Sequence, residues 1–445
     1  MALNRLLDLD LIFKSGSRGY LLCNSIRALG AFSGFLTAYL SIRYGSASEY
    51  GYFLFAVSLI GFLPDFVSSL VVAEYLNCFT RSLGQPMRLK DVSNSNRAQY
   101  QELFNWFWIS CFISLICASF VPVFHSFHGF LVLIAVAIYV YSKQHLTILS
   151  EKLRLSFPPF IGDFLLFVAP QSLVILLLCI LHSLQPGLRL NALQIAFSSS
   201  VSYLLVLLIV GLNKMLKSYV KEDVCGPRQA AILFAKLRSP SGSALTNQLS
   251  LATFLAYSSI RLPSLFLGFS SAQISSVAVY GILQRIQYLI SIPGYSFIAW
   301  NSRRLANAAS KTSRQGILNL GLGMLFVSVA SPLAFWLVFI NYRQSVAWLF
   351  SKNGFGFEVS PYLLAVVLVA TSLLVLQSFV NNALTASSKF GLLLRSQALR
   401  LMVILIAFVL LSVLNRVSVG MIFALEVASL LVCFVLVLFE IKALK

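Results

Sequence analysis

Apolar windows, each about twenty residues long, follow one another along most of the chain and are separated by short polar segments. A window of this length crosses the hydrocarbon core of a bilayer as one helix. Lipid offers no partner to backbone amides, so a spanning segment must bond its own backbone groups, as a helix does. We read twelve windows, at residues 18–42, 51–74, 103–123, 127–147, 158–182, 191–213, 244–268, 273–299, 316–340, 361–384, 391–414 and 418–441.

The composition excludes a soluble globular protein. Hydrophobic residues make up 58% of the 445 residues, and charged residues only 11%. A soluble domain has about 25% charged residues. The sequence therefore predicts an all-α, polytopic membrane protein of about twelve transmembrane helices.

The lysine and arginine residues predict the orientation of these helices. Of the 33 basic residues, five fall in predicted outer segments, six lie within the windows, and the others share the side of the N-terminus. Because basic loops stay in the cytoplasm, we expect both termini there. The same bias explains most of the formal net charge of +19, so no nucleic-acid partner is expected.

The chain divides into two predicted six-helix lobes. Residues 1–213 form the first lobe, 214–243 a cytoplasmic linker with an amphipathic piece, and 244–445 the second lobe. A Tyr-Gly pair lies near the predicted outer face in each lobe, at Tyr50 and at Tyr280, and a proline follows about four turns later. An even number of helices per lobe predicts parallel repeats, related by an axis along the membrane normal.

The first seventeen residues, MALNRLLDLDLIFKSGS, are expected to lie on the membrane surface. They mix acids and bases and lack the apolar region of a signal peptide. A short amphipathic helix at the inner interface fits this pattern.

Motifs for soluble-type chemistry are absent from the sequence. The seven cysteines include no Cys-x-x-Cys pair, and the four histidines are scattered near the ends of the windows. A Gly-rich phosphate loop, His-Glu-x-x-His and Gly-x-Ser-x-Gly are also absent. We therefore expect no enzyme activity, no catalytic residue, no metal and no cofactor.

Charged side chains inside the windows are the candidate functional residues. A charge at bilayer depth costs roughly 2.5–3.5 kcal/mol on insertion scales, so it needs a partner, a hydrated cavity or a ligand. Arg27 and Asp65 both lie about 13 Å from the inner boundary, on neighbouring antiparallel windows. A buried structural pair is one expectation for them, and a place for Arg27 in a cationic site is the other.

The remaining embedded acids have possible basic partners. Lys143 and Arg395 lie within about two turns of the inner edge and can extend their charges to water. Asp163 is at a similar depth and can pair with either. Arg400 is deeper, and Glu426 is its candidate partner although their depths differ by about 9 Å.

Two arginines of the second lobe have no obvious acid at matching depth, Arg261 and Arg285. Polar residues surround them, with Tyr257 near the first and Gln284 and Gln287 beside the second. Unpaired guanidinium groups facing lipid would be too costly, so these helix faces are expected to line water. Such a cavity selects an anion, and guanidinium suits phosphate because its planar fork donates two parallel hydrogen bonds.

Three prolines fall inside predicted helices, Pro64, Pro263 and Pro293. Proline removes one intrahelical hydrogen bond and bends the helix. The bend serves either a helix that moves during alternating access or a static kink in a rigid bundle, and the sequence supports both alternatives equally.

Two stretches are similar to signatures of a known family. RYGSASEYGYFLFAVSLIGFLPDF begins at Arg43, and FLGFSSAQISSVAVYGILQRI begins at Phe266. The first resembles the turn and second helix of Wzx-like flippases for O-antigen and exopolysaccharide units, and the second resembles the matching feature between their seventh and eighth helices. That family shares a superfamily with multidrug (MATE) exporters and lipid II flippases.

The resemblance implies transport of an undecaprenyl-diphosphate-linked oligosaccharide from the inner to the outer leaflet of a bacterial cytoplasmic membrane. In that family, cations in a central cleft meet the diphosphate or acidic sugars, which would place Arg27, Arg261 and Arg285 there. Membrane lipids and other polysaccharide-assembly proteins are the implied partners. Many relatives carry an acid in the seventh helix, whereas this chain has none from Leu245 to Gly268.

Three alternative functions remain open at this point. A MATE-like antiporter for cations or drugs would use Asp65, Asp163 or Glu426 as its coupling site. A lipid II flippase differs in its substrate and usually has two further helices. A membrane polysaccharide polymerase or ligase usually has a large outer loop, whereas the longest predicted outer loop here spans only about 341–360.

Overall fold

The structure is a computed structural model, and it describes residues 16–82, 112–156, 159–187, 189–212, 240–270, 274–310, 314–341, 360–387, 389–414 and 417–443. Four predicted features fall wholly or partly outside these ranges: the surface helix at 1–17, the window at 103–123, the linker at 214–243 and the outer loop at 341–360. The division into lobes at the linker therefore stays a prediction.

Every regular element in the described ranges is helical, as the apolar windows predict. The longer helices of the first half are α3 (Gly16–Tyr44), α4 (Ala47–Ser82), α6 (Phe127–Ser156), α8 (Ala169–Leu184) and α9 (Ala192–Leu212), and the short ones are η2 (Pro122–Phe124), α7 (Pro159–Asp163) and the π-helix η3 (Phe164–Val168). Those of the second half are α12 (Pro240–Ser270), α13 (Ser275–Ser310), α14 (Arg314–Asn341), α16 (Pro361–Ala386), α17 (Phe390–Val413) and α18 (Val419–Ala443).

Within the described residues, ten helical segments are long and apolar enough to cross a membrane, and each overlaps a predicted window. This finding confirms the all-α, multi-pass membrane fold. Helix α13 is 36 residues long but is not one of the ten. Its polar stretch around Arg285 lowers its mean hydropathy, which fits a position inside the bundle.

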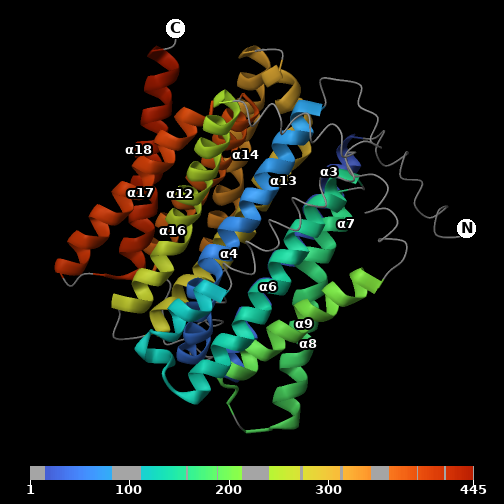
Figure 1. Ribbon diagram of the computed structural model, residues 1–445, viewed down its shortest axis with the longest axis vertical. Coiled ribbons are helices and arrows are strands. Elements are labelled where there is room, and N and C mark those ends of the chain that lie inside the picture. Colours follow the sequence, from blue (N-terminus) through green and yellow to red (C-terminus); the bar gives the residue numbers. More distant parts are fainter. Residues whose placement is uncertain are drawn as a thin grey trace, which may run out of the picture.

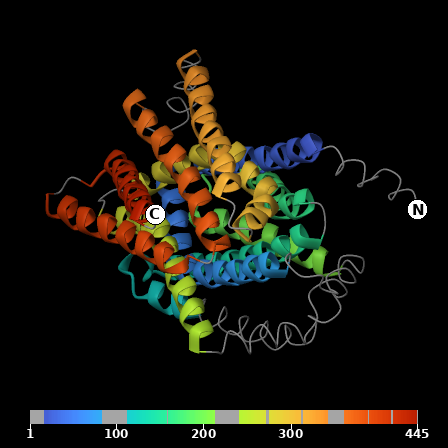
Figure 2. The same ribbon diagram turned by 90° about the horizontal axis from the view of Figure 1, so that it is seen from above.

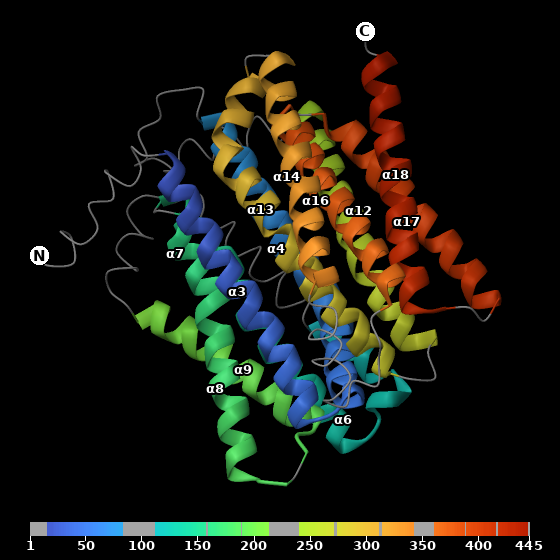
Figure 3. The ribbon, with the colours of Figure 1, turned by 180° about the vertical axis from the view of Figure 1, so that it is seen from behind.

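Helices α4 and α13 run through the centre of the bundle (Figures 1 and 3). Helices α6–α9 lie on one side of them and α16–α18 on the other. Seen from above, α3 and α4 lie next to the yellow helices of the second half (Figure 2). The two halves meet mainly where α13 packs on α3 and α4, and where α12 packs on α4.

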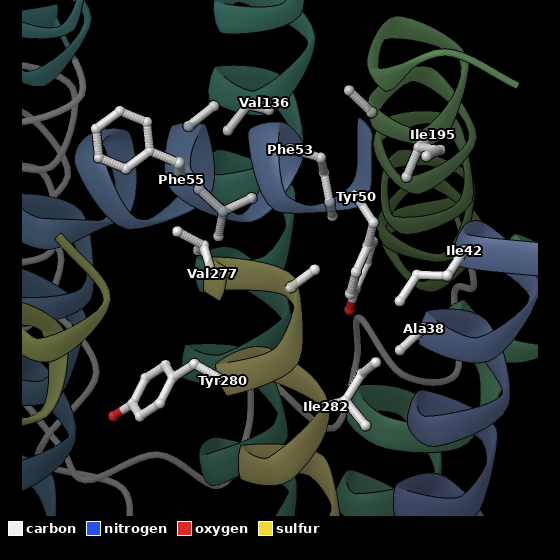
Figure 4. Close-up of a cluster of buried hydrophobic side chains, with 14 of the residues drawn as sticks. Ala38, Ile42, Tyr50, Phe53, Phe55, Val136, Ile195, Val277, Tyr280 and Ile282 are labelled. Carbon is white, nitrogen blue, oxygen red and sulfur yellow. The ribbon is translucent and has the colours of Figure 1, made fainter. Parts of the chain in front are cut away.

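One hydrophobic core continues across this boundary (Figure 4). Phe55 and Val136 enter it from the first half, and Val277 and Tyr280 from the second. All four side chains are at most 1% exposed. Lipid provides no hydrophobic force between helices, so close packing and polar contacts must hold such an interface together.

The seam between α4 and α12–α13 is packed without space for additional atoms. A Cβ added at Gly51 would overlap the carbonyl oxygen of Ile274, so only glycine allows this approach of the two backbones. Further along the same seam, the Ser264 hydroxyl donates a hydrogen bond to the Ser58 hydroxyl at 2.9 Å. The predicted outer ends of the two halves are therefore in direct contact.

Replacing Gly51 with alanine is expected to destabilise the protein, because the new methyl group collides with a backbone carbonyl of the other half. Overpacking of this kind costs about 1–3 kcal/mol, which thermal unfolding in detergent will measure. Gly321→Ala in α14 is the matched control, since a Cβ there would meet the Phe379 ring at an ordinary 3.7 Å. Equal melting temperatures for the two variants would contradict this packing.

Candidate functional site

Arg27 of α3 is paired with Asp163, the last residue of α7. Its Nε donates to Asp163 Oδ2 at 2.7 Å and its Nη2 to Oδ1 at 3.4 Å, and both residues are buried. The expected pair of Arg27 with Asp65 is therefore wrong, as is the pairing of Asp163 with Lys143 or Arg395. Arg395 instead bonds Glu440 in an exposed pair at 2.8 Å.

The local backbone helps to present Asp163 to Arg27. A π-helix, η3, follows Asp163 directly, and the chain returns to α-helix at Ala169. Such single-turn bulges occur often at functional sites, because they change the direction of neighbouring side chains. Helix α3 packs on α7, η3 and α8 along this segment.

Asp65 of α4 forms an ion pair with Arg261 of α12, across the boundary between the two halves. Asp65 is 5% exposed at its side chain and Arg261 22%. The expectation that Arg261 has no acid is therefore wrong. Depth along the membrane had matched Asp65 with Arg27, but the packing of α4 on α12 turns this carboxylate toward the second half.

Arg285 of α13 lies among aromatic hydroxyl groups. Its guanidinium interacts with the hydroxyl of Tyr50 and lies in the electrostatic neighbourhood of Tyr139 and Tyr203. It also lies against the backbone of α3, because a Cβ added at Gly34 would be only 3.3 Å from Nη1. Among the described residues, no carboxylate lies within 4 Å of this guanidinium.

Lys143 of α6 provides a second cation near Arg285. Its Nζ lies over the Tyr139 ring, 6.0 Å from the centroid, and it interacts electrostatically with both Tyr203 and Arg285. Helix α6 continues to Ser156, so Lys143 lies roughly 20 Å from the end of the helix. The apolar part of the helix ends at Ser150, about two turns beyond Lys143, as the sequence predicts. The Lys143 side chain is half-buried, and no described carboxylate lies within 4 Å of it.

A chain of buried hydrogen bonds holds one of these tyrosines in place. The Gln171 amide donates to the Tyr203 hydroxyl at 2.9 Å, and Thr37 donates to the Gln171 carbonyl oxygen at 2.9 Å. The rings of Tyr139 and Tyr203 meet edge to face, with centroids 5.0 Å apart. The hydroxyl groups near the two cations therefore belong to a fixed set from α4, α6 and α9.

The cluster of Arg285, Lys143, Tyr50, Tyr139 and Tyr203, here called the basic cluster, can bind an anion. Two like charges in a low-dielectric interior repel each other, and an anion between them removes that cost. Guanidinium, ammonium and hydroxyl groups are all hydrogen-bond donors that phosphate oxygens accept. The cluster is poorly suited to a cationic ligand.

A second polar network lies inside the second half. The Tyr280 hydroxyl of α13 donates to Glu426 Oε1 of α18 at 2.7 Å, and Gln284 also interacts with Tyr280. Arg400 of α17 interacts electrostatically with Glu426, but no described carboxylate lies within 4 Å of the Arg400 guanidinium. The expected Arg400–Glu426 pair is thus not formed. Gln287 is buried beside this carboxylate.

The other predicted site residues lie on the helices that carry these networks. Tyr257 is half-buried on α12, one turn before Arg261. Pro64, Pro263 and Pro293 lie inside continuous helices, α4, α12 and α13. The role of these prolines in helix bending stays a prediction. No cluster of three potential metal ligands occurs among the described residues.

The sequence interpretation missed Lys143 and the three tyrosines of the basic cluster. Lys143 was assigned to the inner interface from its distance to the end of the window. The segment YVYSKQH does carry a signal, because Tyr139 precedes Lys143 by four residues and therefore shares its helix face. Tyr50 was noticed only for its position in the Tyr-Gly repeat.

Comparisons with known proteins identify the fold. No family model matches the sequence, and no curated protein matches it. Similar solved structures are the MATE multidrug transporter DinF-BH (14% identity, 95% of each chain, TM-score 0.63) and a mutant of the Vibrio cholerae MATE transporter VcmN (11% identity, 97% of this chain and 98% of that one, TM-score 0.61). A third is a MOP superfamily transporter from Pyrococcus furiosus (14% identity, 97% of each chain, TM-score 0.59). The chain therefore has the fold of MATE transporters.

The ion pair between the halves yields a test of its energy. Asp65→Asn leaves Arg261 without its counter-charge and is expected to destabilise the protein by about 3 kcal/mol, because breaking a buried pair strands a charge. Adding Arg261→Gln is expected to restore part of that loss in a double-mutant cycle of thermal unfolding. Glu440→Gln, which breaks the exposed pair with Arg395, is the control and is expected to cost less than about 1 kcal/mol. Additive effects of the two central substitutions would contradict the pairing.

Proposed function

We propose that this protein is a membrane transporter of the MATE-containing superfamily that flips an anionic, lipid-linked oligosaccharide from the inner to the outer leaflet. The expected substrate carries undecaprenyl diphosphate, and the expected location is the bacterial cytoplasmic membrane, with both termini in the cytoplasm. Membrane lipids and other polysaccharide-assembly proteins are the expected partners. The observation that carries the proposal is the surplus of positive charge in the basic cluster.

The distribution of charge at the boundary between the halves favours an anionic substrate. Asp163 and Asp65 are each bonded to an arginine, Arg27 and Arg261. Arg285 and Lys143 then carry positive charge for which the described residues supply no carboxylate within 4 Å. Both side chains are half-buried, so an anion can reach them, and a transported anion would supply the counter-charge that a cation at membrane depth needs.

A diphosphate matches the geometry of the donors better than a single carboxylate does. The guanidinium of Arg285 offers a planar fork, Lys143 offers a point charge, and the tyrosine hydroxyls offer further donors. These groups come from α13, α6, α4 and α9, so a diphosphate bound there would contact both halves at once. A ligand that bridges the halves can couple its own passage to their relative movement.

The fold supports a transporter, and the two signature stretches support the flippase family. The lipid and sugar parts of the proposal rest on the resemblance of the segments that begin at Arg43 and Phe266. The Pyrococcus furiosus transporter is described as having a binding pocket of reverse polarity that suggests a different function. Its description supports the idea that this fold accommodates pockets of more than one polarity.

The competing function is a MATE-like antiporter for cationic drugs, which the fold alone fits equally well. A cationic drug requires a carboxylate that it can reach, and of the candidate coupling acids Asp65, Asp163 and Glu426, the first two are held by arginines. Glu426 is the exception, and it lies inside the second half beside Arg400. The charge distribution therefore disfavours the drug antiporter.

Removing either cation of the basic cluster is expected to abolish most transport. Arg285→Gln and Lys143→Gln each remove charge-assisted hydrogen bonds worth about 1.5–3 kcal/mol, so about a 10- to 100-fold loss is expected for each. The measurement is export of the lipid-linked glycan in cells whose own flippase gene is deleted and replaced by each variant. Arg285→Lys keeps the charge and is expected to retain part of the activity.

The matched control is Arg395→Gln, which removes an exposed arginine of the second half that is bonded only to Glu440 among the described residues. Its export is expected to equal that of the unmodified protein. Normal export by both cluster variants would refute the anion site. Drug resistance without glycan export would favour the antiporter.

A further inference from the structure

Gln171 of α8 lies outside the basic cluster and is joined to it by one hydrogen bond. The residue is 8% exposed, and its amide group is bonded at both ends. The carbonyl oxygen accepts from the Thr37 hydroxyl of α3, and the amide nitrogen donates to the Tyr203 hydroxyl of α9, both at 2.9 Å. Three helices of the first half therefore meet at this amide.

The π-helix η3 turns Gln171 toward α3. Asp163 and Gln171 are eight residues apart, and both are bonded to α3, through Arg27 and Thr37. Two turns of α-helix take about 7.2 residues, so in a regular helix Gln171 would point about 80° away from Asp163. The wider π-turn between them removes most of this difference. Helix α3 packs so closely on η3 that a Cβ added at Gly30 would overlap it.

The bonded amide decides in which direction the Tyr203 hydroxyl donates. An amide nitrogen only donates, so the Tyr203 oxygen is the acceptor in this bond and its single proton stays available. The two cations beside it, Lys143 and Arg285, have no acceptor atom. The neighbouring Tyr139 hydroxyl can accept this proton, but it then offers its own. Whichever hydroxyl ends the chain, one proton remains for an acceptor from outside the cluster.

We propose that Gln171 is a positioning residue that orients the hydroxyl groups of the basic cluster as donors to the transported ligand. This role rests on the proposed function, in which an ionised diphosphate is that ligand. Diphosphate oxygens can accept from the Tyr203 chain, from Arg285 and from Lys143 at the same time. The hydroxyl of an uncharged polyprenol accepts more weakly and brings a proton of its own. Gln171 acts through Tyr203 and does not contact the ligand.

Replacing Gln171 with glutamate reverses the polarity of this chain. A carboxylate accepts from both Thr37 and Tyr203, so it consumes the tyrosine proton and places a negative charge near the two cations. In the purified protein in nanodiscs, Gln171→Glu is expected to weaken binding of a polyprenyl diphosphate at least about tenfold. The affinity for the uncharged polyprenol of equal length is expected to stay unchanged. An equal loss for both lipids would indicate a purely structural role and would overturn the proposal.

A double-mutant cycle separates positioning from packing. Gln171→Leu keeps the Tyr203 hydroxyl but not its orientation, and a loss of diphosphate affinity of about three- to tenfold is expected. Tyr203→Phe removes the hydroxyl, and a loss of about tenfold or more is expected. Because Gln171 acts through Tyr203, adding Gln171→Leu to Tyr203→Phe is expected to cause no further loss. Additive losses would overturn the proposal. If Gln171→Glu fails to fold, this cycle decides the matter.

The matched control is Gln185→Glu, which introduces the same charge at an exposed glutamine at the end of the same helix. Its affinities for both lipids are expected to equal those of the parent. If the parent prefers the diphosphate and both Gln171 variants keep that preference in full, the role of Gln171 is refuted and the flippase proposal stands. If the parent binds the two lipids equally, the proposed anion site is refuted, and the role of Gln171 with it.

Discussion

A guanidinium group enclosed by membrane-spanning helices needs a negative partner, and the organisation of this protein depends on which arginines have one. Arg27 and Arg261 are bonded to aspartates, the first within one half and the second across the boundary. For Arg285 the described residues provide aromatic hydroxyls and a neighbouring lysine instead. Two types of arginine thus occur at one interface, one paired with protein acids and one available to an anion.

This difference connects the fold to a transport cycle. The ion pair of Asp65 with Arg261 and the close approach at Gly51 hold α4 against α12 and α13. The basic cluster contains residues of both halves. An anion bound there would either compete with the contacts at Asp65 and Gly51 or add to them. Glu426 of α18 accepts a hydrogen bond from Tyr280 of α13, and Tyr280 interacts electrostatically with Arg261 of α12.

The sequence was sufficient for the fold and insufficient for the pairing of charges. Window lengths and the asymmetry of the basic loops depend only on the order of residues along the chain, so the helices could be predicted. The predicted pair of Arg27 with Asp65 was based on depth in the membrane alone. It was wrong because the packing of a helix decides which neighbour each of its faces meets. Helix α13 is not among the helices that are apolar enough to cross a membrane, because the polar residues that suit it to the centre of the bundle also lower its mean hydropathy.

The site residues were predicted unevenly for the same reason. Arg285 stood out because a cation in an apolar window has a high cost that is visible in sequence. Lys143 did not, because the groups beside it, Tyr203 of α9 and Arg285 of α13, come from other helices and only the packing brings them together. The supporting tyrosines are ordinary residues of aromatic-rich helices, and only the three-dimensional arrangement shows that Tyr50 reaches Arg285.

The most direct measurement of the central claim is the affinity of the purified protein in nanodiscs for two lipids of equal chain length, a polyprenyl diphosphate and its uncharged polyprenol. If the basic cluster is an anion site, the diphosphate should bind at least about tenfold more tightly, and added salt should reduce the difference. Equal affinity for the two lipids at low salt would contradict the claim that the cluster selects a phosphate-bearing substrate.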